Sequence, residues 1–541
     1  MRHPWRLALL IVAALAVVAV AAIVFVSSRV SFSSETARAR MVAVLESQLD
    51  GEVELDDLQL KVLPRLRAEG RGLRIHHKGR RDVPPLISIE HFSAEGSFIS
   101  LYRRHVSHLK VDGLDIQIPP DRNRGPEDAD KPGNIDKPGD TDEPGESDDH
   151  QFRRERSGAA RAVVIDEMTS TNTRLVIIPK EPGKDPKVWT IHQLRMHDLG
   201  VDQPMPFEAT LTNAVPPGEI ETKGSFGPWQ AEIPGLTPLD GTFVFDHADL
   251  GFFKGISGIL SAHGKYGGTL NRIDVNGQTE TPQFRVTAAG NPVPLRTTYH
   301  AIVDGTNGNT FLDPVNGSFL NTSLVAKGAV VGTPGKHGRT VTLDITMDRA
   351  RLEDVLQLAV KSPKPPMTGA LRLTTKFVLP PGDREVVERL RLDGKFAIAG
   401  TRFTDEGVQT KINELSHRSR GKTPADDKQH VSSQFNGTFK LGGGTLTIPT
   451  VTFDVPGSIV HLAGTYALVP QTIDFSGTLE MDATISQMTT GFKSKLLRIV
   501  DPIFERKGGG GTEIPIKING VRTNPSFGVD KARLFKHRDE K

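Results

Sequence analysis

Residues 446–455 read Leu-Thr-Ile-Pro-Thr-Val-Thr-Phe-Asp-Val, and apolar residues alternate with polar ones on both sides of the proline. The same alternation returns farther along, at Ile473, Phe475, Leu479 and Met481. A period of two residues is typical of β-strands with one buried and one solvated face. This stretch therefore predicts an antiparallel, hairpin-rich β-sheet.

Glycine followed two residues later by Phe, Tyr or Leu is a second recurring pattern, found between residues 162 and 482. The glycines are Gly224, Gly241, Gly264, Gly317, Gly369, Gly394, Gly437, Gly464 and Gly477. Their irregular spacing excludes a strict solenoid repeat. We expect each glycine to begin a strand after a turn, and the large side chain that follows to point to one face of the sheet.

Alternation extends toward the N-terminus, so strands are also expected between residues 53 and 118. The apolar members there are Val53, Leu55, Leu58, Leu60, Val62, Ile87, Ile89, Leu114, Ile116 and Ile118. A last pair of strands is expected at 512–529, after a flexible hinge at Gly508–Gly511. The predicted fold class is thus mostly β, with an elongated, curled antiparallel sheet and a few short helices.

Helical spacing interrupts the strand pattern in three places, at 33–49, 349–360 and 486–504. The last of these carries one apolar stripe, formed by Met488, Phe492, Leu496, Ile499 and Ile503. An amphipathic helix of this kind covers an apolar surface or contacts a membrane. We expect it to be a lid or a membrane-contact helix, with plain structural cover as the alternative.

Leu7–Val26 is an apolar run without charge or glycine. About 20 residues at 1.5 Å each span the roughly 30 Å hydrocarbon core of a bilayer. A cleaved signal peptide has a shorter apolar region of about 7–15 residues, and a buried helix is the other alternative. We expect residues 1–28 to form a single-pass transmembrane anchor. The arginines on its two sides nearly balance, so the charge rule leaves its orientation open.

Residues 121–160 show no periodicity and contain an acidic hexapeptide that recurs from Asp130, Asp136 and Asp142. This composition predicts a disordered linker. The expected domain organisation is an anchor at 1–28, a helix plus β region at 29–120, the linker at 121–160, a β-groove body at 161–485, an amphipathic helix and glycine hinge at 486–511, and C-terminal strands and tail at 512–541.

The composition excludes several kinds of chemistry. The chain has no cysteine, so disulfides, thiol nucleophiles and cysteine-ligated metals are excluded. Lys plus Arg is 67 and Asp plus Glu is 65, a near balance that gives no support to nucleic-acid binding. The sequence contains no phosphate-binding loop, nucleophile elbow or zinc-protease motif. We therefore expect a protein that is not an enzyme, with no catalytic residue, cofactor or metal site.

A long sheet with large apolar residues on one face must bury that face against something. If its two sides curl toward each other, they enclose an apolar trough that can hold lipid acyl chains; an ordinary filled sandwich core is the alternative. The candidate groove residues are Phe243, Phe245, Phe319, Phe396, Phe439, Phe453 and Phe475. Charged residues should be absent from such a groove, because burying a charge without a partner is costly.

Several segments, in their order along the chain, resemble the AsmA-like family of bacterial envelope proteins (the AsmA/TamB type). In the N-terminal part these are the apolar anchor, Val53-Glu-Leu55, Leu60-Lys-Val-Leu-Pro64, Leu86-Ile-Ser-Ile89 and Leu109-Lys-Val-Asp-Gly-Leu-Asp-Ile116. In the C-terminal part they are Phe435-Asn-Gly-Thr-Phe-Lys-Leu441, Ile473-Asp-Phe-Ser-Gly477, Gly491-Phe-Lys-Ser-Lys-Leu-Leu497, Asp501-Pro-Ile-Phe504 and Ile514-Pro-Ile-Lys-Ile-Asn-Gly520. Each segment alone is weakly specific, so the resemblance depends on their order.

The resemblance implies a single-pass protein of the bacterial inner membrane, with its body in the periplasm and a role in outer-membrane assembly or maintenance. Larger relatives form a β-groove thought to conduct phospholipids, so phospholipid or a lipid bilayer is the implied partner, and outer-membrane assembly proteins are further ones. The acidic linker departs from the family pattern, and the chain is shorter than the bridging members. The alternative is a non-enzymatic scaffold or regulator of an outer-membrane protein assembly machine. A hydrolase of envelope polymers is a third, more remote reading.

Overall fold

The structure is a computed structural model. It describes residues 51–61, 66–77, 84–97, 105–118, 164–177, 187–200, 203–228, 233–287, 290–332, 338–362, 364–420, 431–483 and 510–530, with residue 230 and scattered positions between 35 and 46. This part is mostly β-strand with few helices, which confirms the predicted fold class at that level. The chain divides into two compact units: unit 1 is Met1–Asp246 with Lys265–Ile273, and unit 2 is His247–Gly264 with Asp274–Lys541.

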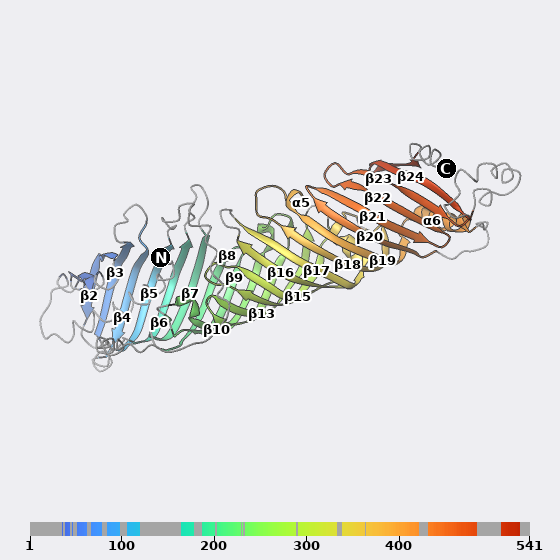
Figure 1. The fold of residues 1–541 in the computed structure, drawn as a ribbon. Coiled ribbons are helices and arrows are strands. Elements are labelled where there is room, and N and C mark those ends of the chain that lie inside the picture. Colours follow the sequence, from blue (N-terminus) through green and yellow to red (C-terminus); the bar gives the residue numbers. More distant parts are fainter. Residues whose placement is uncertain are drawn as a thin grey trace, which may run out of the picture. The chain divides into compact units, whose positions relative to one another are not determined.

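Unit 1 is built on a single curled sheet (Figure 1). Its strands are β1 (Gly51–Glu54), β2 (Asp57–Lys61), β3 (Leu66–His77), β4 (Ile87–Gly96), β5 (His105–Ile118), β6 (Val164–Ile177), β7 (Lys187–Leu199), β8 (Met205–Ala214), β9 (Pro217–Phe226) and β10 (Pro238–Asp249). Both β1 and β2 pair with β3, and from β3 each strand pairs with the next along the chain.

Strands β5 and β6 are parallel, so the antiparallel prediction is wrong at this pairing. Parallel neighbours require a long crossover connection, and residues 119–163, which include the predicted linker, join these two strands. Polar side chains match across the pair: His105 Nδ1 lies 2.9 Å from Asp166 Oδ1, and His108 Nε2 lies 3.2 Å from Glu167 Oε2. These contacts help to fix the register.

The core of unit 1 lies on the face of its sheet that is opposite to these polar pairs. On that face, apolar side chains of neighbouring strands lie directly across from one another. Leu73, Ile87 and Leu109 are almost completely buried there. The described positions between 35 and 46 are helical, and Met41 packs into this core at 5 % exposure. The helix predicted at 33–49 is confirmed at those positions, and its Met41 and Val42 pack on the apolar face of unit 1.

Unit 2 continues the pattern with strands in consecutive antiparallel pairs from β14 to β25. They are β14 (Val293–Val303), β15 (Thr310–Phe319), β16 (Thr322–Gly332), β17 (Arg339–Arg351), β18 (Met367–Leu379), β19 (Arg391–Phe403), β20 (Ser433–Gly442), β21 (Thr445–Val455), β22 (Ser458–Ala467), β23 (Thr472–Met481), β24 (Thr512–Val521) and β25 (Asn524–Val529). Strands β11 (Ile256–Ser257), β12 (Ile259–Thr269) and β13 (Arg272–Val286) lie near the boundary between the units in sequence. The strands predicted at 512–529 are therefore confirmed.

The helices of unit 2 are α4 (Leu352–Ala359), α5 (Val386–Arg389) and α6 (Glu406–Ser419); short 3₁₀ turns are η2 (Pro234–Leu236), in unit 1, and η3 (Leu250–Phe252). Helix α4 confirms the helix predicted at 349–360 except at its start, because residues 349–351 belong to β17. Helix α6 was not predicted; it begins at the N-cap Asp405, whose side chain accepts a hydrogen bond from the Val408 amide.

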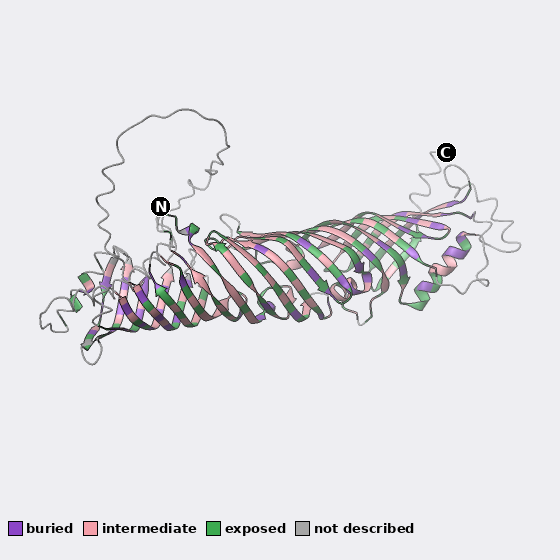
Figure 2. Ribbon diagram, turned by 90° about the horizontal axis from the view of Figure 1, so that it is seen from below, coloured by how far each residue is buried: buried purple, intermediate pink, exposed green. Residues whose placement is uncertain are grey.

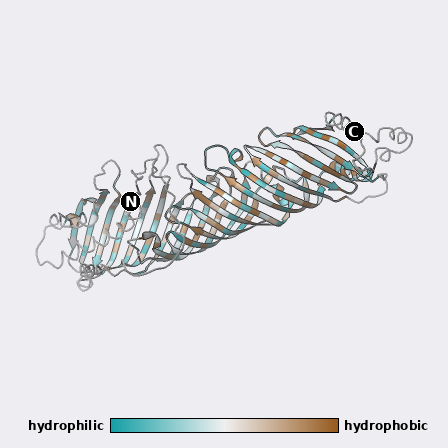
Figure 3. Ribbon diagram, viewed as in Figure 1, coloured by the Kyte–Doolittle hydropathy of each residue, from teal (hydrophilic) through white to brown (hydrophobic). Residues whose placement is uncertain are grey.

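Three predicted segments lie outside the described residues: the anchor at 1–28, the linker at 121–160 and the helix at 486–504. Within the part that the structure describes, no helix has the length and apolar character to cross a membrane. Along the described strands, exposed positions alternate with more buried ones (Figure 2), and hydrophilic residues alternate with hydrophobic ones (Figure 3). The period of two that the sequence shows is thus the period of the fold.

Candidate functional site

The pairing register of unit 2 identifies one face of its sheet as apolar. Residues directly opposite each other on antiparallel strands place their side chains on the same face. One row of such partners crosses the unit, namely Leu373, Phe396, Gly437, Val451, Leu462, Gly477 and Ile516. We call the face that carries this row, and the rows on the same side of it, the apolar face of unit 2.

Charged side chains are almost excluded from this face. At the paired positions from β14 to β24 it carries no Asp, Glu or Lys, and Arg339 at the beginning of β17 is its one arginine. The other face holds the charges, which form cross-strand ion pairs such as Lys327–Asp313 at 2.7 Å and Lys440–Asp393 at 3.2 Å. The two faces of one sheet therefore offer an apolar surface and a solvated one.

Much of the apolar face is only partly buried. Leu373, Phe396, Val451, Leu462 and Ile516 are all of intermediate exposure. A closed sandwich core would bury side chains in the middle of its strands, as unit 1 buries Leu73 and Leu109. The exposure in unit 2 favours an open apolar surface over a filled core.

Two helices cover parts of this face. Helix α4 packs Val355 and Leu356 against a cluster that contains Leu371 and Ile398. Helix α6 packs Ile412 and Leu415 against a second cluster, which contains Phe453, Val455 and Val460.

The predicted groove residues Phe319, Phe396, Phe439, Phe453 and Phe475 all lie on the apolar face of unit 2. Phe319 and Phe453 are buried, at 2 % and 9 % exposure, whereas the other three are partly exposed. The rings of Phe396 and Phe439 lie 6.3 Å apart.

The remaining two predicted residues, Phe243 and Phe245, lie on β10 in unit 1, opposite Thr222 and Ile220. Both are partly exposed. The structure therefore gathers five of the predicted residues on one face of unit 2, and the other two belong to unit 1.

Sequence reasoning missed Phe403 and Phe435, which belong to the same face. The Phe435 ring stacks on Phe453 with 4.4 Å between centroids, and Phe403 meets both rings edge-on. Phe435 lies two residues before Gly437, but the motif was defined only by the residue that follows each glycine. Counting aromatic residues on both sides of the glycine would have found it.

The recurring glycines lie inside strands, so the prediction that they begin strands after turns is wrong. Gly394 of β19 lies directly opposite Phe439 of β20, and Gly437 of β20 lies opposite Phe396 of β19. A Cβ at Gly394 would lie 2.8 Å from Phe439 Cζ, and one at Gly437 would lie 2.9 Å from Phe396 Cζ. Each glycine thus leaves bare backbone against which the partner strand's ring packs.

The predicted lid or membrane-contact residues Met488, Phe492, Leu496, Ile499 and Ile503 lie outside the described residues. The two ends of the connection that contains them are fixed beside α6. The Ala483 amide donates to the Ser419 carbonyl, and the Thr512 hydroxyl donates to the Ala483 carbonyl at 2.8 Å. The connection therefore starts and finishes next to the helix that covers Phe453.

The titratable groups of unit 2 are consistent with an apolar surface. Burial raises the pKa of the Tyr299 phenol above its ordinary value, and Tyr299 lies on the apolar face opposite Val315. On the charged face, hydrogen bonds to the Asp313 carbonyl and the Asp274 carboxylate raise the pKa of His300. Within the residues that the structure describes, no group of three or more His, Asp or Glu side chains could hold a metal ion.

Comparison of the chain with protein-family models, with curated proteins and with solved structures finds no significant match.

Proposed function

We propose that this protein holds phospholipid acyl chains on the apolar face of unit 2. The observation that supports this most directly is the combination of three properties on one surface: it is continuous from β14 to β24, almost free of charge, and partly exposed. Exposing a contiguous apolar surface to water costs free energy. An apolar surface of this extent is typical of a binding site.

The energetics suit acyl chains. Moving apolar area out of water contributes about 25 cal/mol per Å², or about 0.8 kcal/mol for each CH₂ group. Phe439, Phe475 and Leu462 provide such area, and their neighbours on the same face require no desolvation of charge. An acyl chain bound on this face would therefore regain much of the free energy of apolar burial that it loses on leaving a bilayer.

The cellular role that we propose follows from the resemblance to the AsmA-like family. Residues 1–28 would anchor the protein in a bacterial inner membrane, with the β-sheet body in the periplasm. The protein would hold or transfer phospholipid for outer-membrane assembly or maintenance without catalysing a reaction.

Native mass spectrometry with lipid extraction tests the proposal on the full chain purified in mild detergent. We expect phospholipid to co-purify with the wild type and to be lost from Phe439→Asp and Phe475→Asp, which place a carboxylate on the apolar face. Thr438→Asp and Ser476→Asp are the matched controls, since these residues are the sequence neighbours of the two phenylalanines and point to the opposite face. Phe453 is a poor choice, because it is buried beneath α6 and its replacement would unfold the cluster.

A wild-type protein free of lipid, or Phe→Asp variants that retain as much lipid as their controls, would contradict the proposal. Either result would favour the scaffold, which needs protein contacts and no lipid. Circular dichroism of each variant shows whether the sheet is intact.

A further inference from the structure

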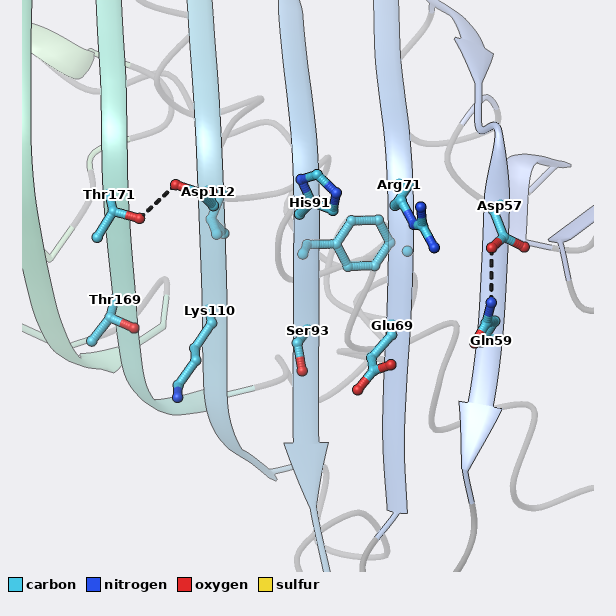
Figure 4. Close-up of a pocket in the computed structure, with 13 residues that line it drawn as sticks. Asp57, Gln59, Glu69, Arg71, His91, Ser93, Lys110, Asp112, Thr169 and Thr171 are labelled. Atoms are coloured by element: carbon cyan, nitrogen blue, oxygen red, sulfur yellow. Dashed lines mark hydrogen bonds between the residues drawn. The ribbon is translucent and has the colours of Figure 1, made fainter.

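A pocket of about 520 Å³ lies on the polar face of unit 1, across strands β2 to β6 (Figure 4). The register arranges its side chains in two neighbouring rows. The first row contains Arg71, His91 and Asp112, and the second contains Glu69, Ser93 and Lys110. This face is the reverse of the one that carries the core of unit 1.

Backbone irregularities beside the first row account for the hollow. Gly72 in β3 and Gly113 in β5 have left-handed backbone angles, with φ of 62° and 66°, and Asn172 in β6 has φ of 54°. At this level the ladder skips one residue on each strand between β3 and β4 and between β4 and β5, and two residues on each strand between β5 and β6. A Cβ at Gly72 would lie 1.9 Å from Asp56 Oδ2, so glycine is required there. These breaks in the ladder, together with the left-handed residues beside them, change which side chains point to this face.

The carboxylates of the pocket already have partners. Glu69 accepts hydrogen bonds from Lys61 at 2.9 Å and Arg67 at 3.2 Å, which lower its pKa. Asp112 accepts from Thr171 at 2.7 Å and Asn172 at 2.8 Å, and these bonds likewise lower its pKa. The third carboxylate, Asp57, accepts from Gln59 at 3.0 Å.

The cations of the pocket have no such partners. Arg71 and Lys110 are exposed, and neither forms a side-chain hydrogen bond or ion pair within the described part of the chain. Ser93 lies beside Lys110 in the second row, and His91 lies beside Arg71 in the first. Glu69 is thus paired with two cations, and Asp57 and Asp112 keep their charge but are engaged by neutral donors, while Arg71, Lys110, His91 and Ser93 stay available to a ligand.

We propose that this pocket binds a phosphate group, with Arg71 and Lys110 supplying charge and His91 and Ser93 supplying hydrogen bonds. Guanidinium forms paired hydrogen bonds to phosphate oxygens, and lysine adds a point charge. The phosphate could be a free anion or part of a glycerophosphate headgroup. This pocket is lined by residues of unit 1, whereas the acyl-chain proposal concerns unit 2. A negative result for one proposal therefore does not contradict the other.

Isothermal titration of the full chain in mild detergent at low salt tests the site, with inorganic phosphate, glycerol 3-phosphate and glycerol as three separate probes. Both phosphates should bind and glycerol should not. Tighter binding of glycerol 3-phosphate identifies a lipid-headgroup site, and equal binding identifies a site for the bare anion. Arg71→Gln and Lys110→Gln should each weaken phosphate binding about tenfold or more, because each removes a charged hydrogen bond.

The matched control is the pair Arg174→Gln and Arg195→Gln. These residues carry the same charge on the same face, but they pair with Asp115 and Glu167 outside the pocket. The control variants should bind phosphate like the wild type. No binding of either phosphate by the wild type, or equal weakening in the control variants, would overturn the proposal.

Discussion

At the scale of single residues, the glycine–phenylalanine pairs show how a strand can carry large rings and still offer a continuous surface. Gly394 faces Phe439 and Gly437 faces Phe396, so each of two neighbouring strands gives the other's ring a bare stretch of backbone. A side chain larger than hydrogen at either glycine would displace the ring.

Gly437→Ala should therefore destabilise unit 2 by about 1–3 kcal/mol, the usual cost of overpacking a tight site. The new Cβ would lie 2.8 Å from the Thr450 carbonyl oxygen and 2.9 Å from the Phe396 ring. Gly442→Ala on the same strand is the control, since a Cβ there meets nothing within 4 Å, and it should change stability by less than about 0.5 kcal/mol. Urea unfolding followed by circular dichroism measures both. Equal midpoints for the two variants would show that the rings do not pack against the glycines.

At the scale of elements, local periodicity predicted the strands well and their partners less well. The spacing of Leu352, Val355 and Leu356 was enough to predict α4. Helix α6 was missed because much of its buried side is polar, with Gln409, Ser416 and Ser419 buried, so no apolar stripe marks it. The gathering of phenylalanines in unit 2 was predictable, because one period of two places alternate residues on one face. The rows that helices cover could not be predicted, because alternation within the strands does not say on which face a connecting helix packs.

The parallel pairing of β5 with β6 could not be predicted from alternation either, since alternation is the same for both directions of pairing. The parallel pairing requires a minimum length of the connection between β5 and β6, and this requirement can be tested. Strand β5 is 14 residues long, or about 46 Å at about 3.3 Å per residue, and a parallel crossover must return along that length. Deleting 125–150 leaves 119–124 and 151–163, which can span the distance, so the fold should keep its stability.

Deleting 121–160 leaves only 119, 120 and 161–163, which reach less than about 20 Å. This variant should lose the β5–β6 pairing and its contacts, such as Asp112 with Thr171, whereas the shorter deletion should not. Amide hydrogen exchange in residues 105–118 and 164–177 distinguishes the two. Full protection of both strands in the longer deletion would show that the pairing is not the parallel one.

At the scale of the whole molecule, the two units use the same kind of sheet differently. From β1 to β7, unit 1 buries its apolar face in a filled core with Met41 packed against it, whereas Phe243 and Phe245 of β10 stay partly exposed. Unit 2 leaves much of its apolar face partly exposed outside the clusters that α4 and α6 cover. In the proposed function, acyl chains would therefore be bound by unit 2, and unit 1 would serve as a stable support. Loss of function should follow from charges placed on the open face, even where they leave folding intact.

Leu462→Asp tests this consequence in cells. Leu462 lies in the central row of the apolar face, opposite Val451, and is partly exposed, so a carboxylate there would meet bound acyl chains. Because Leu462 also packs against the cluster that contains Phe453, circular dichroism must first show that the variant is folded. Ala463→Asp is the control, because Ala463 is its exposed neighbour on the charged face, opposite Ser476. In a bacterial strain that relies on this chain, the first variant should raise envelope permeability to a large hydrophobic antibiotic to the level of the deletion, and the second should behave like the wild type. Equal permeability in the two strains, with both proteins present at wild-type abundance, would show that the function does not depend on the apolar face of unit 2.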